Sequence, residues 1–315
     1  MLQGAGYATA AVGKRDMGQA KRFLPLQRGF GFFYGHGNNG IDYYTHERYG
    51  GPSMFLNNDC TEADRAPMPP TFSRASSCAF SARTSQNHGS STSPSTLHTV
   101  RPPLPLLLGR KWSPRPRRHQ KTSSRPIEKR GIGEKFARYY GAVTCMNAAI
   151  GEILKTIRES GGEKDTLLIF MSDNGGAGNE DNAPLTGSKS TMWEGGLRVP
   201  FIARWPGHIP AGTVIDDFIT SLEVFPTLLV ATGTKPPPNV ILDGFDMMPI
   251  LAGREKSPRT EMFWQRRNEK AARVGNWKCL ESAKGTGLFD LSGDVGETKV
   301  LSAEKPDVLA KIKGR

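Results

Sequence analysis

A chain of 315 residues with 37% hydrophobic residues, 36 Gly and 23 Pro is typical of a globular, loop-rich α/β protein with one large domain, or a large and a small one. The formal charge of +12 would suggest a nucleic-acid or acidic partner, but residues 65–127 hold 11 of the 42 basic residues and none of the 30 acidic ones. The remaining 31 basic and 30 acidic residues nearly cancel, which excludes a basic surface spread over the whole protein.

Outside that segment, the apolar pattern predicts alternating helices and strands. The N-terminal LQGAGYATAAVGK reads as a helix end, the turn GAGY and a short apolar strand. From Phe136 the apolar residues recur at helical spacing until Gly161 and Gly162 end the run. The later predicted elements are strands at 166–171 and 199–207 and an amphipathic helix at 221–233. This order predicts an α/β fold with a mainly parallel sheet sandwiched by helices. The part from about residue 235 onward is separately expected to form a smaller C-terminal α+β subdomain.

Residues 73–126 differ from both flanks. Ser, Arg and Pro dominate, apolar periodicity is absent, and only the stretch LPLLL is suited to burial. One interpretation is a disordered basic insert. A structureless loop of this length inside a compact domain counts against that interpretation.

Asp173 and Asn174 directly follow the strand predicted at 166–171. Asx residues before glycine make good turns, so the pair alone is explained by a polar loop start. Ligands of α/β sheets, however, bind at the carboxyl ends of the strands, and a carboxylate with an amide oxygen suits calcium or magnesium. Two ligands do not complete such a site, so the functional interpretation requires partners from elsewhere in the fold.

The loop at 182–207 favours the interpretation of Asp173 and Asn174 as part of a binding site over that of a simple turn. Lys189 alone would be a solvated surface lysine. Its loop, however, leaves the same sheet edge and is anchored by Trp193 and two glycines. Glu194 and Arg198 are expected to fix this loop rather than to touch a substrate.

Several motifs, in order, resemble the sulfatase family of the alkaline-phosphatase superfamily. SDNGG followed by GSKSTMWEGGLRVPFIARWPG carries the resemblance, and GYATAAVGKRDMG resembles the family motif GY-x-T-x-x-x-GKWHLG. Further stretches resemble the family's sequence and occur in the same order as in the family: RGFGFFYG, IDYYTH, SLEVFPTLL, LDGFDMMPIL, RVGNWKCLE and LFDLSGDVGE. The likeness covers residues 1–59 and 130–315. The expected domains are a partial N-terminal part at 1–64, the anomalous segment at 65–127, the sulfatase core at 128–234 and the C-terminal subdomain at 235–315.

The resemblance implies an arylsulfatase-like hydrolase of sulfuric esters with bound Ca²⁺. In this family the hydrate of a formylglycine, formed from cysteine, attacks sulfur while cations hold the sulfate oxygens, whose shared charge a metal and fixed lysines stabilise. Asp173 and Asn174 match metal ligands, Lys189 matches a sulfate-contacting lysine, and Lys14 matches the lysine of GKWHLG. The implied partner is a sulfate-ester small molecule or a sulfated glycan, with no nucleic acid and no membrane.

The departures from the family pattern are as informative as the matches. Arg15 and Asp16 replace the tryptophan and histidine of GKWHLG, and a carboxylate there would repel a sulfate. The family's C-x-P-S-R motif is absent, and the first strand with two further metal-binding carboxylates is expected to lie before Met1. The cysteines show neither that motif nor metal-ligand spacing, so we expect no nucleophile and no activity from the chain as written; they are Cys60, Cys78, Cys145 and Cys279.

A shifted reading frame is a second interpretation of the basic segment. Reading the codons of residues 90–99 one base earlier permits F-L-Y-L-A-F-N-A-P-H. This has the apolar strand, the small residues and the histidine that the family would want in a pattern like F-L-x-x-x-N-A-P-H. A frameshift accounts together for the missing acids, the excess of serine and the lost periodicity, and we favour it over a genuine insert. His98 would then be accidental rather than catalytic.

Other functions stay open at this point. A sulfate-binding pseudoenzyme would keep the lysines without a nucleophile, a related phosphodiesterase would share the fold, and a nucleic-acid binder would use the basic segment, although no aromatic-basic motif supports it. No signal peptide and no membrane-spanning run occur in the sequence. Related sulfatases are often exported, so the compartment stays undetermined.

Overall fold

The computed structural model describes residues 1–14, 21–37, 46–61, 134–177, 180–283 and 285–315. The segment at 65–127, with His98, and the departures Arg15 and Asp16 lie outside these ranges. What was predicted for them stays a prediction, as do the domain boundaries. The chain divides into two compact units, the first made of Met1–Glu163 with Leu229–Val240 and the second of Lys164–Leu228 with Ile241–Arg315.

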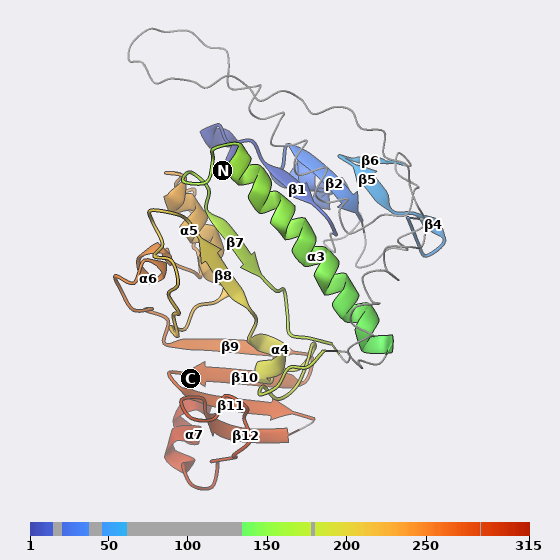
Figure 1. Cartoon of the computed structure of the whole chain (residues 1–315). Helices are drawn as coiled ribbons and strands as arrows, with labels where there is room; N and C mark the ends of the chain where they lie inside the picture. The colour runs from blue at the N-terminus through green and yellow to red at the C-terminus, as the bar shows by residue number, and fades with distance from the viewer. Residues whose placement is uncertain (15–20, 38–45, 62–133, 178–179, 284) are drawn as a thin grey trace. The chain divides into compact units, whose positions relative to one another are not determined.

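A small mixed sheet lies in the first unit (Figure 1). β1 (Ala10–Val12) runs parallel to β2 (Phe32–His36), and antiparallel pairing continues to β5 (Met54–Leu56) and β6 (Asp59–Cys60). The predicted helix end and turn are confirmed, because a short helix stops at Gly6, which has a φ of 86° that favours glycine. The other short elements of this unit are η1 (Gln3–Ala5), η2 (Lys21–Phe23), η3 (Pro25–Arg28), β3 (Glu47–Arg48) and β4 (Gly51–Pro52).

The long helix α3 (Glu134–Glu159) confirms the helix predicted from apolar spacing. Gly161, just after the helix, has a φ of 74°, the left-handed conformation common beyond a helix end. The apolar stripe is less buried than its spacing suggests. Within the part of the chain that the structure describes, four of its members are 36–44% exposed: Phe136, Tyr140, Val143 and Met146.

β7 (Leu168–Met171) and β8 (Phe201–Arg204) are the two strands predicted for the middle of the chain, and both belong to the second unit. They pair antiparallel, with Leu168 opposite Arg204 and Met171 opposite Phe201. The described residues between them contain only the four-residue helix α4 (Glu194–Leu197). The connection is long enough for the crossover that a parallel neighbour needs, but the chain does not use it in this way, and β8 returns in the opposite direction. α6 (Met248–Leu251) packs its buried side chains against this pair.

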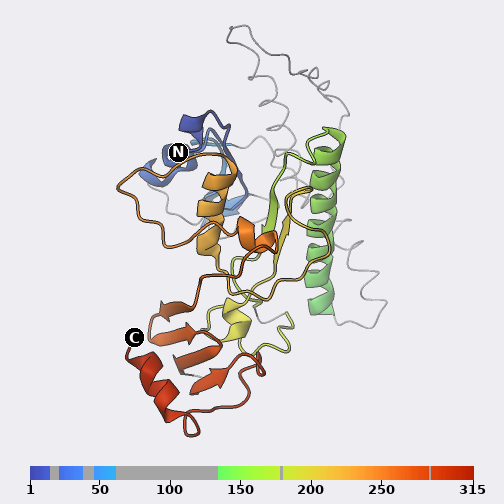
Figure 2. The ribbon, with the colours of Figure 1, turned by 90° about the vertical axis from the view of Figure 1, so that its left-hand side faces the viewer.

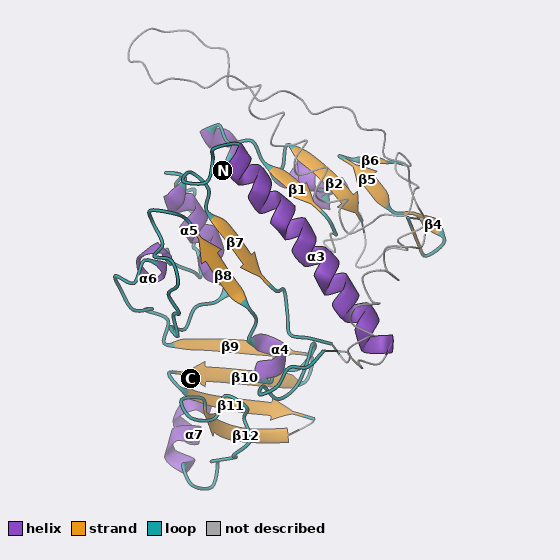
Figure 3. Cartoon of the chain, in the orientation of Figure 1, coloured by secondary structure: helices purple, strands orange, loops and turns teal. Residues whose placement is uncertain are grey.

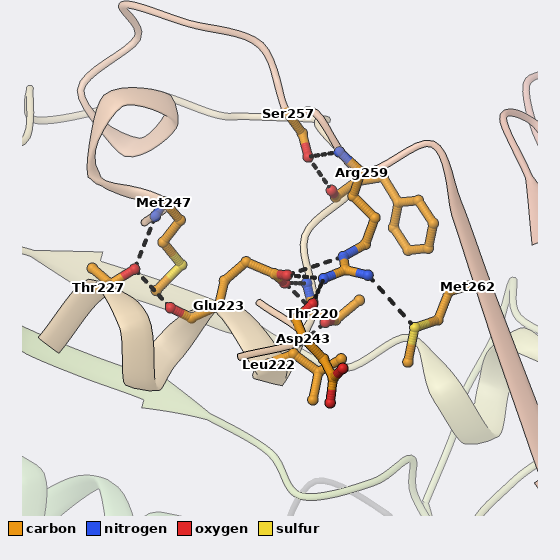
Figure 4. Close-up of polar contacts among 10 residues, drawn as sticks. Thr220, Leu222, Glu223, Thr227, Asp243, Met247, Ser257, Arg259 and Met262 are labelled. Atoms are coloured by element: carbon orange, nitrogen blue, oxygen red, sulfur yellow. Dashed lines mark hydrogen bonds and ion pairs between the residues drawn. The ribbon is translucent and has the colours of Figure 1, made fainter. Parts of the chain in front are cut away.

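The second predicted helix is present as η4 (Ser221–Glu223) followed by α5 (Val224–Ala231), and Gly233 follows with a φ of 64°. Thr220 and Glu223 form a capping box at its start. The Glu223 side chain is fully buried and accepts hydrogen bonds from Arg259 Nε, at 3.0 Å, and from Arg259 Nη2 (Figure 4). Arg259 also donates to the carbonyl of Asp243 at 3.0 Å. One buried ion pair thus joins the helix start to the chain that enters the C-terminal sheet.

The C-terminal subdomain predicted from the sequence is a four-stranded antiparallel sheet with one helix (Figures 2 and 3). α7 (Pro306–Lys313) covers one face, where Ile312 packs on Cys279 and Leu288. The opposite face presents Leu280 and Phe289, which pack with residues of the loop around α4. The strands are β9 (Glu261–Arg266), β10 (Glu269–Val274), β11 (Trp277–Ser282) and β12 (Gly285–Asp290). Among the described residues, no helix combines the length and apolar character needed to cross a bilayer.

Candidate functional site

The carboxyl end of β7 turns sharply to present Asp173 and Asn174. Ser172 Oγ donates to the carbonyl of Asn174 at 2.8 Å, which closes a local turn. The Asp173 side chain is exposed and Asn174 is half-buried. The strand end therefore offers an exposed carboxylate followed in sequence by a half-buried side-chain amide.

Glycines allow backbone contact at this strand end and within the loop before α4. Gly175 N donates to the carbonyl of Gly196 at 3.1 Å. A Cβ atom on Gly175 would overlap the carbonyl of Gly195, and a Cβ on Gly196 would overlap that of Thr191. Gly175 is thus required by the close approach of the α4 backbone to the strand end, and Gly196 by the close approach of its own loop.

The loop that carries Lys189 is held to the same strand end. Lys189 N donates to the carbonyl of Gly176 at 2.7 Å. Asn182 reinforces the contact, because its side chain accepts from Gly176 N at 3.2 Å and donates to the carbonyls of Gly176, at 3.3 Å, and Gly187, at 3.2 Å. The Lys189 side chain is exposed. Asp173, Asn174 and Lys189, predicted separately from the sequence, therefore lie on one backbone assembly in the second unit.

Trp193 anchors the far end of the loop in the C-terminal sheet. It is buried with Met192, Leu280 and Phe289, and its ring centroid lies 5.5 Å from that of Phe289. The loop also turns tightly beneath it, since a Cβ on Gly187 would lie 2.5 Å from the Trp193 Cβ. The anchoring role predicted for Trp193 is consistent with this packing.

Glu194 lies at the centre of a buried charge cluster. Its carboxylate accepts from Lys278 Nζ at 2.9 Å and from Arg198 Nε at 2.8 Å. Glu297 contributes a second carboxylate, with Oε1 2.8 Å from Lys278 Nζ and Oε2 accepting from Glu194 N at 2.6 Å. These contacts agree with the expected loop-fixing role of Glu194 and Arg198. Lys278 and Glu297 escaped the sequence reasoning because a lysine in a strand pattern and an acid in a turn read as solvated side chains.

The pKa values of the two carboxyl groups in the cluster are shifted in opposite directions. Burial by itself would raise the pKa of Glu194, but the charge of Lys278 and hydrogen bonds from Lys278 and Arg198 outweigh it, so the pKa of Glu194 is lowered. Burial raises the pKa of Glu297 despite the opposing charge of Lys278. Charge pairing therefore outweighs burial at Glu194, whereas burial outweighs charge pairing at Glu297.

Glu194→Gln is expected to cost the second unit about 1–3 kcal/mol at neutral pH, since it weakens charge-assisted hydrogen bonds. A lowered folded-state pKa contributes stability that is complete above the ordinary value of 4.5 and is lost as the pH falls through the folded value. The gap between parent and variant should therefore narrow at acidic pH. Urea unfolding at pH 7 and pH 3.5 measures it, with Glu304→Gln in an exposed pair as control. An equal gap at both pH values would contradict the assignment.

Lys14 belongs to the first unit, where it follows β1 and has an exposed side chain. It borders a cavity of about 300 Å³ whose other lining residues are mainly apolar, among them Phe23, Phe30 and Phe33. Arg28 is a second cation of this lining. The structure therefore brings together three of the four predicted site residues and describes Lys14 within its own unit.

Asp173 and Asn174 offer the types of oxygen ligand that a hard cation prefers. Two such ligands are too few to complete its coordination. Carboxylate and amide oxygens are the ligands that calcium accepts, but calcium takes six to eight of them. Within the described ranges, no group of three or more His, Cys, Asp or Glu side chains could hold a metal ion. Of the cysteines, Cys279 is buried, which raises the pKa of its thiol; Cys60 is exposed, Cys145 is half-buried, and Cys78 lies outside the described residues.

Comparison with known proteins places this geometry in context. A family model described as Sulfatase matches residues 1–234. The chain is 36% identical to arylsulfatase A of Homo sapiens over 196 residues, which are 56% of this chain and 38% of that protein. It is 29% identical to N-acetylgalactosamine-6-sulfatase of Mus musculus over 288 residues, 89% of this chain and 53% of that protein. The chain thus spans about half the length, or less, of these relatives.

Solved structures show the same fold. Ps i-CgsB in complex with k-i-k-neocarrahexaose has a TM-score of 0.79 at 22% identity, over 99% of this chain and 71% of that chain. The PsFucS1 sulfatase from Pseudoalteromonas sp. has a TM-score of 0.70 at 22% identity, over 99% and 70% of the two chains. These likenesses confirm the alkaline-phosphatase-like α/β fold with a C-terminal antiparallel subdomain.

Proposed function

Because the chain belongs to the sulfatase family, we propose that the end of β7 and the Lys189 loop form part of the sulfate-ester site of a sulfuric ester hydrolase. The observation that carries the proposal is the hydrogen bond from Lys189 N to the carbonyl of Gly176, at 2.7 Å. It holds an ammonium-bearing loop to the strand end that presents Asp173 and Asn174. A cation and an oxygen-ligand pair on one rigid assembly suit an anionic ester.

Each residue has a role in this proposal. Lys189 binds sulfate oxygens through its ammonium group, and Lys14 supplies a second cation. Asp173 and Asn174 hold a calcium ion, which when bound spreads the negative charge of the sulfate and fixes its orientation. The backbone contacts of Gly175 and Gly176 hold the strand end and the Lys189 loop together before the ligand arrives, which lowers the cost of ordering them on binding.

The substrate class follows from the relatives. One relative is named for a 6-sulfated amino sugar, and one solved neighbour was crystallised with a neocarrahexaose. We propose a sulfate-ester small molecule or a sulfated glycan as the ligand of this chain. Its sequence contains no C-x-P-S-R motif, so we expect the 315-residue chain by itself to bind a sulfate ester without hydrolysing it.

Lys189→Met tests the site directly. It removes a charge-assisted hydrogen bond and is expected to raise the sulfate Kd roughly tenfold or more in the presence of Ca²⁺. Titration calorimetry of the full chain with sodium sulfate measures the change. Asp173→Asn should weaken Ca²⁺ binding and, through it, sulfate binding. Lys299→Met, in an exposed ion pair with Glu304, is the matched control and should leave the Kd unchanged.

Unaltered sulfate affinity in both site variants would refute the proposed site. Hydrolysis of 4-nitrocatechol sulfate by the parent chain would refute the expectation that it lacks a nucleophile. Sequencing the gene upstream of Met1 and through the codon of Lys135 gives a separate test. A C-x-P-S-R frame joined to this one, with a single-base change restoring the histidine pattern, would identify a complete sulfatase at the locus.

A further inference from the structure

Lys278 lies on β11 with a side chain that is completely buried. A buried ammonium group is stable only when it is paired, and here two carboxylates from different segments surround it. Glu194 Oε1 lies 2.9 Å from Nζ and Glu297 Oε1 lies 2.8 Å from it. Arg273 stands opposite Lys278 in the β10–β11 register, so the carboxylates also offset two like charges that face each other.

The cluster joins three segments that are distant in the sequence. Glu194 begins α4 at the end of the Lys189 loop, Lys278 belongs to the C-terminal sheet, and Glu297 belongs to the turn after β12. Glu297 has a φ of 55°, which is uncommon for a residue with a side chain. Hydrogen bonds from Thr298 N, at 2.7 Å, and Lys299 N, at 2.8 Å, to Asp294 hold this turn. The acceptor for the Glu194 backbone is therefore preset by the turn.

A short backbone path leads from this cluster to the candidate site. Glu194 is followed by Gly195, whose N donates to the carbonyl of Thr186 at 2.7 Å, and by Gly196, whose carbonyl accepts from Gly175 N at 3.1 Å. Because each step of this path is a covalent bond or a backbone hydrogen bond, we expect a shift of Glu194 to move both the loop that carries Lys189 and the contact with the strand end that carries Asp173.

The apolar contacts of Trp193 stabilise the docking of the loop on the sheet. They do not select one register, because hydrophobic packing is not directional. A lysine shared by two carboxylates has a narrow range of favourable geometry and leaves unpaired buried charges in any other register. We propose that Lys278, with Glu297, is a positioning residue that sets the register of the Lys189 loop on the C-terminal sheet. The functional meaning of that register rests on the proposed role of Lys189, but the positioning itself is a property of the fold.

Hydrogen exchange tests the positioning without any ligand or activity. In Lys278→Met, amides of residues 186–197 are expected to exchange roughly tenfold faster or more, while the strands β9–β12 keep most of their protection. Lys278→Arg keeps a cation and should return the loop toward parental exchange. Lys313→Met is the control: it breaks an exposed ion pair with Glu281, which lies on β11 as Lys278 does. This variant should leave the exchange rates of the loop amides unchanged.

A general loss of stability is separated from positioning by Leu288→Ala. Leu288 is buried on the opposite face of the sheet, against α7, and its truncation weakens the subdomain without touching the loop. At equal global stability, faster loop exchange in Lys278→Met than in Leu288→Ala supports positioning, and equal loop exchange overturns it. If Lys278→Met does not fold, Glu297→Gln replaces it as the test variant, because it keeps the Lys278–Glu194 pair. Unchanged exchange of the loop amides in Glu297→Gln would then overturn the proposal.

Sulfate titration of the same variants keeps this inference distinct from the proposed function. If the parent chain binds sulfate, Lys278→Met should weaken binding at least several-fold and Lys278→Arg should restore it, whereas Leu288→Ala should not weaken it. A parent chain that fails to bind sulfate would refute the proposed function. The exchange result would still decide whether Lys278 positions the loop.

Discussion

Arg259→Met is expected to lower the free energy of unfolding of the second unit by about 3–5 kcal/mol, because it leaves a fully buried Glu223 carboxylate without its cation. Arg259 supplies two donors to that carboxylate and a third contact to the carbonyl of Asp243 (Figure 4). Methionine fills much of the same volume but cannot replace any of these hydrogen bonds. The change therefore removes the ion pair that ties the helix start to the C-terminal sheet.

Urea unfolding followed by tryptophan fluorescence measures this loss, because the described tryptophans all belong to the second unit: Trp193, Trp205, Trp264 and Trp277. Lys256→Met provides the matched control. It breaks an ion pair with Asp217 at 3.3 Å whose lysine side chain is 91% exposed, so its effect should stay within about 1 kcal/mol. The double variant Glu223→Gln with Arg259→Met should recover part of the loss by removing the unpaired charge. Equal effects of Arg259→Met and Lys256→Met would contradict the burial argument.

Gly175→Ala is expected to destabilise the second unit by about 1–3 kcal/mol and to abolish measurable sulfate binding. The new methyl group would overlap the carbonyl of Gly195, so the strand end and the α4 segment would have to separate. That separation breaks the Gly175–Gly196 hydrogen bond and shifts the neighbouring contact between Gly176 and Lys189. Both the stability and the geometry of the candidate site depend on the missing Cβ.

The matched control for this prediction is Gly293→Ala, an exposed glycine of the same unit where a Cβ meets nothing within 4 Å. Alanine there should change the stability by no more than about 0.5 kcal/mol, because the methyl group meets no packed atoms. Urea midpoints and sulfate titrations of both variants, compared with the parent, give the result. A Gly175→Ala protein with parental stability and sulfate affinity would show that the two backbones can separate at no cost.

Local chemistry made several elements predictable. The helical spacing after Phe136 and the glycine at 161 were enough to place α3, because a helix and its end are determined by neighbouring residues. The apolar runs before Asp173 and after Arg198 located β7 and β8 in the same way. What these patterns could not state was the direction of pairing. The antiparallel return of β8 became visible only in the pairing of the two strands, because a connection of this length allows either direction.

For the candidate site, too, some features could be predicted from the sequence and others only from the tertiary structure. By itself the sequence determined the family, the hard-oxygen character of Asp173 and Asn174, and the identity of Lys189 as a candidate cation, because these depend on residue types in order along the chain. Only the tertiary structure placed Lys189 against the carboxyl end of β7 and revealed Lys278 and Glu297 as buried partners of Glu194. A lysine in a strand and a glutamate in a turn carry no local sign of burial. Their roles are decided by which distant segments exclude water from them, and that depends on contacts between residues about 80 to 100 positions apart.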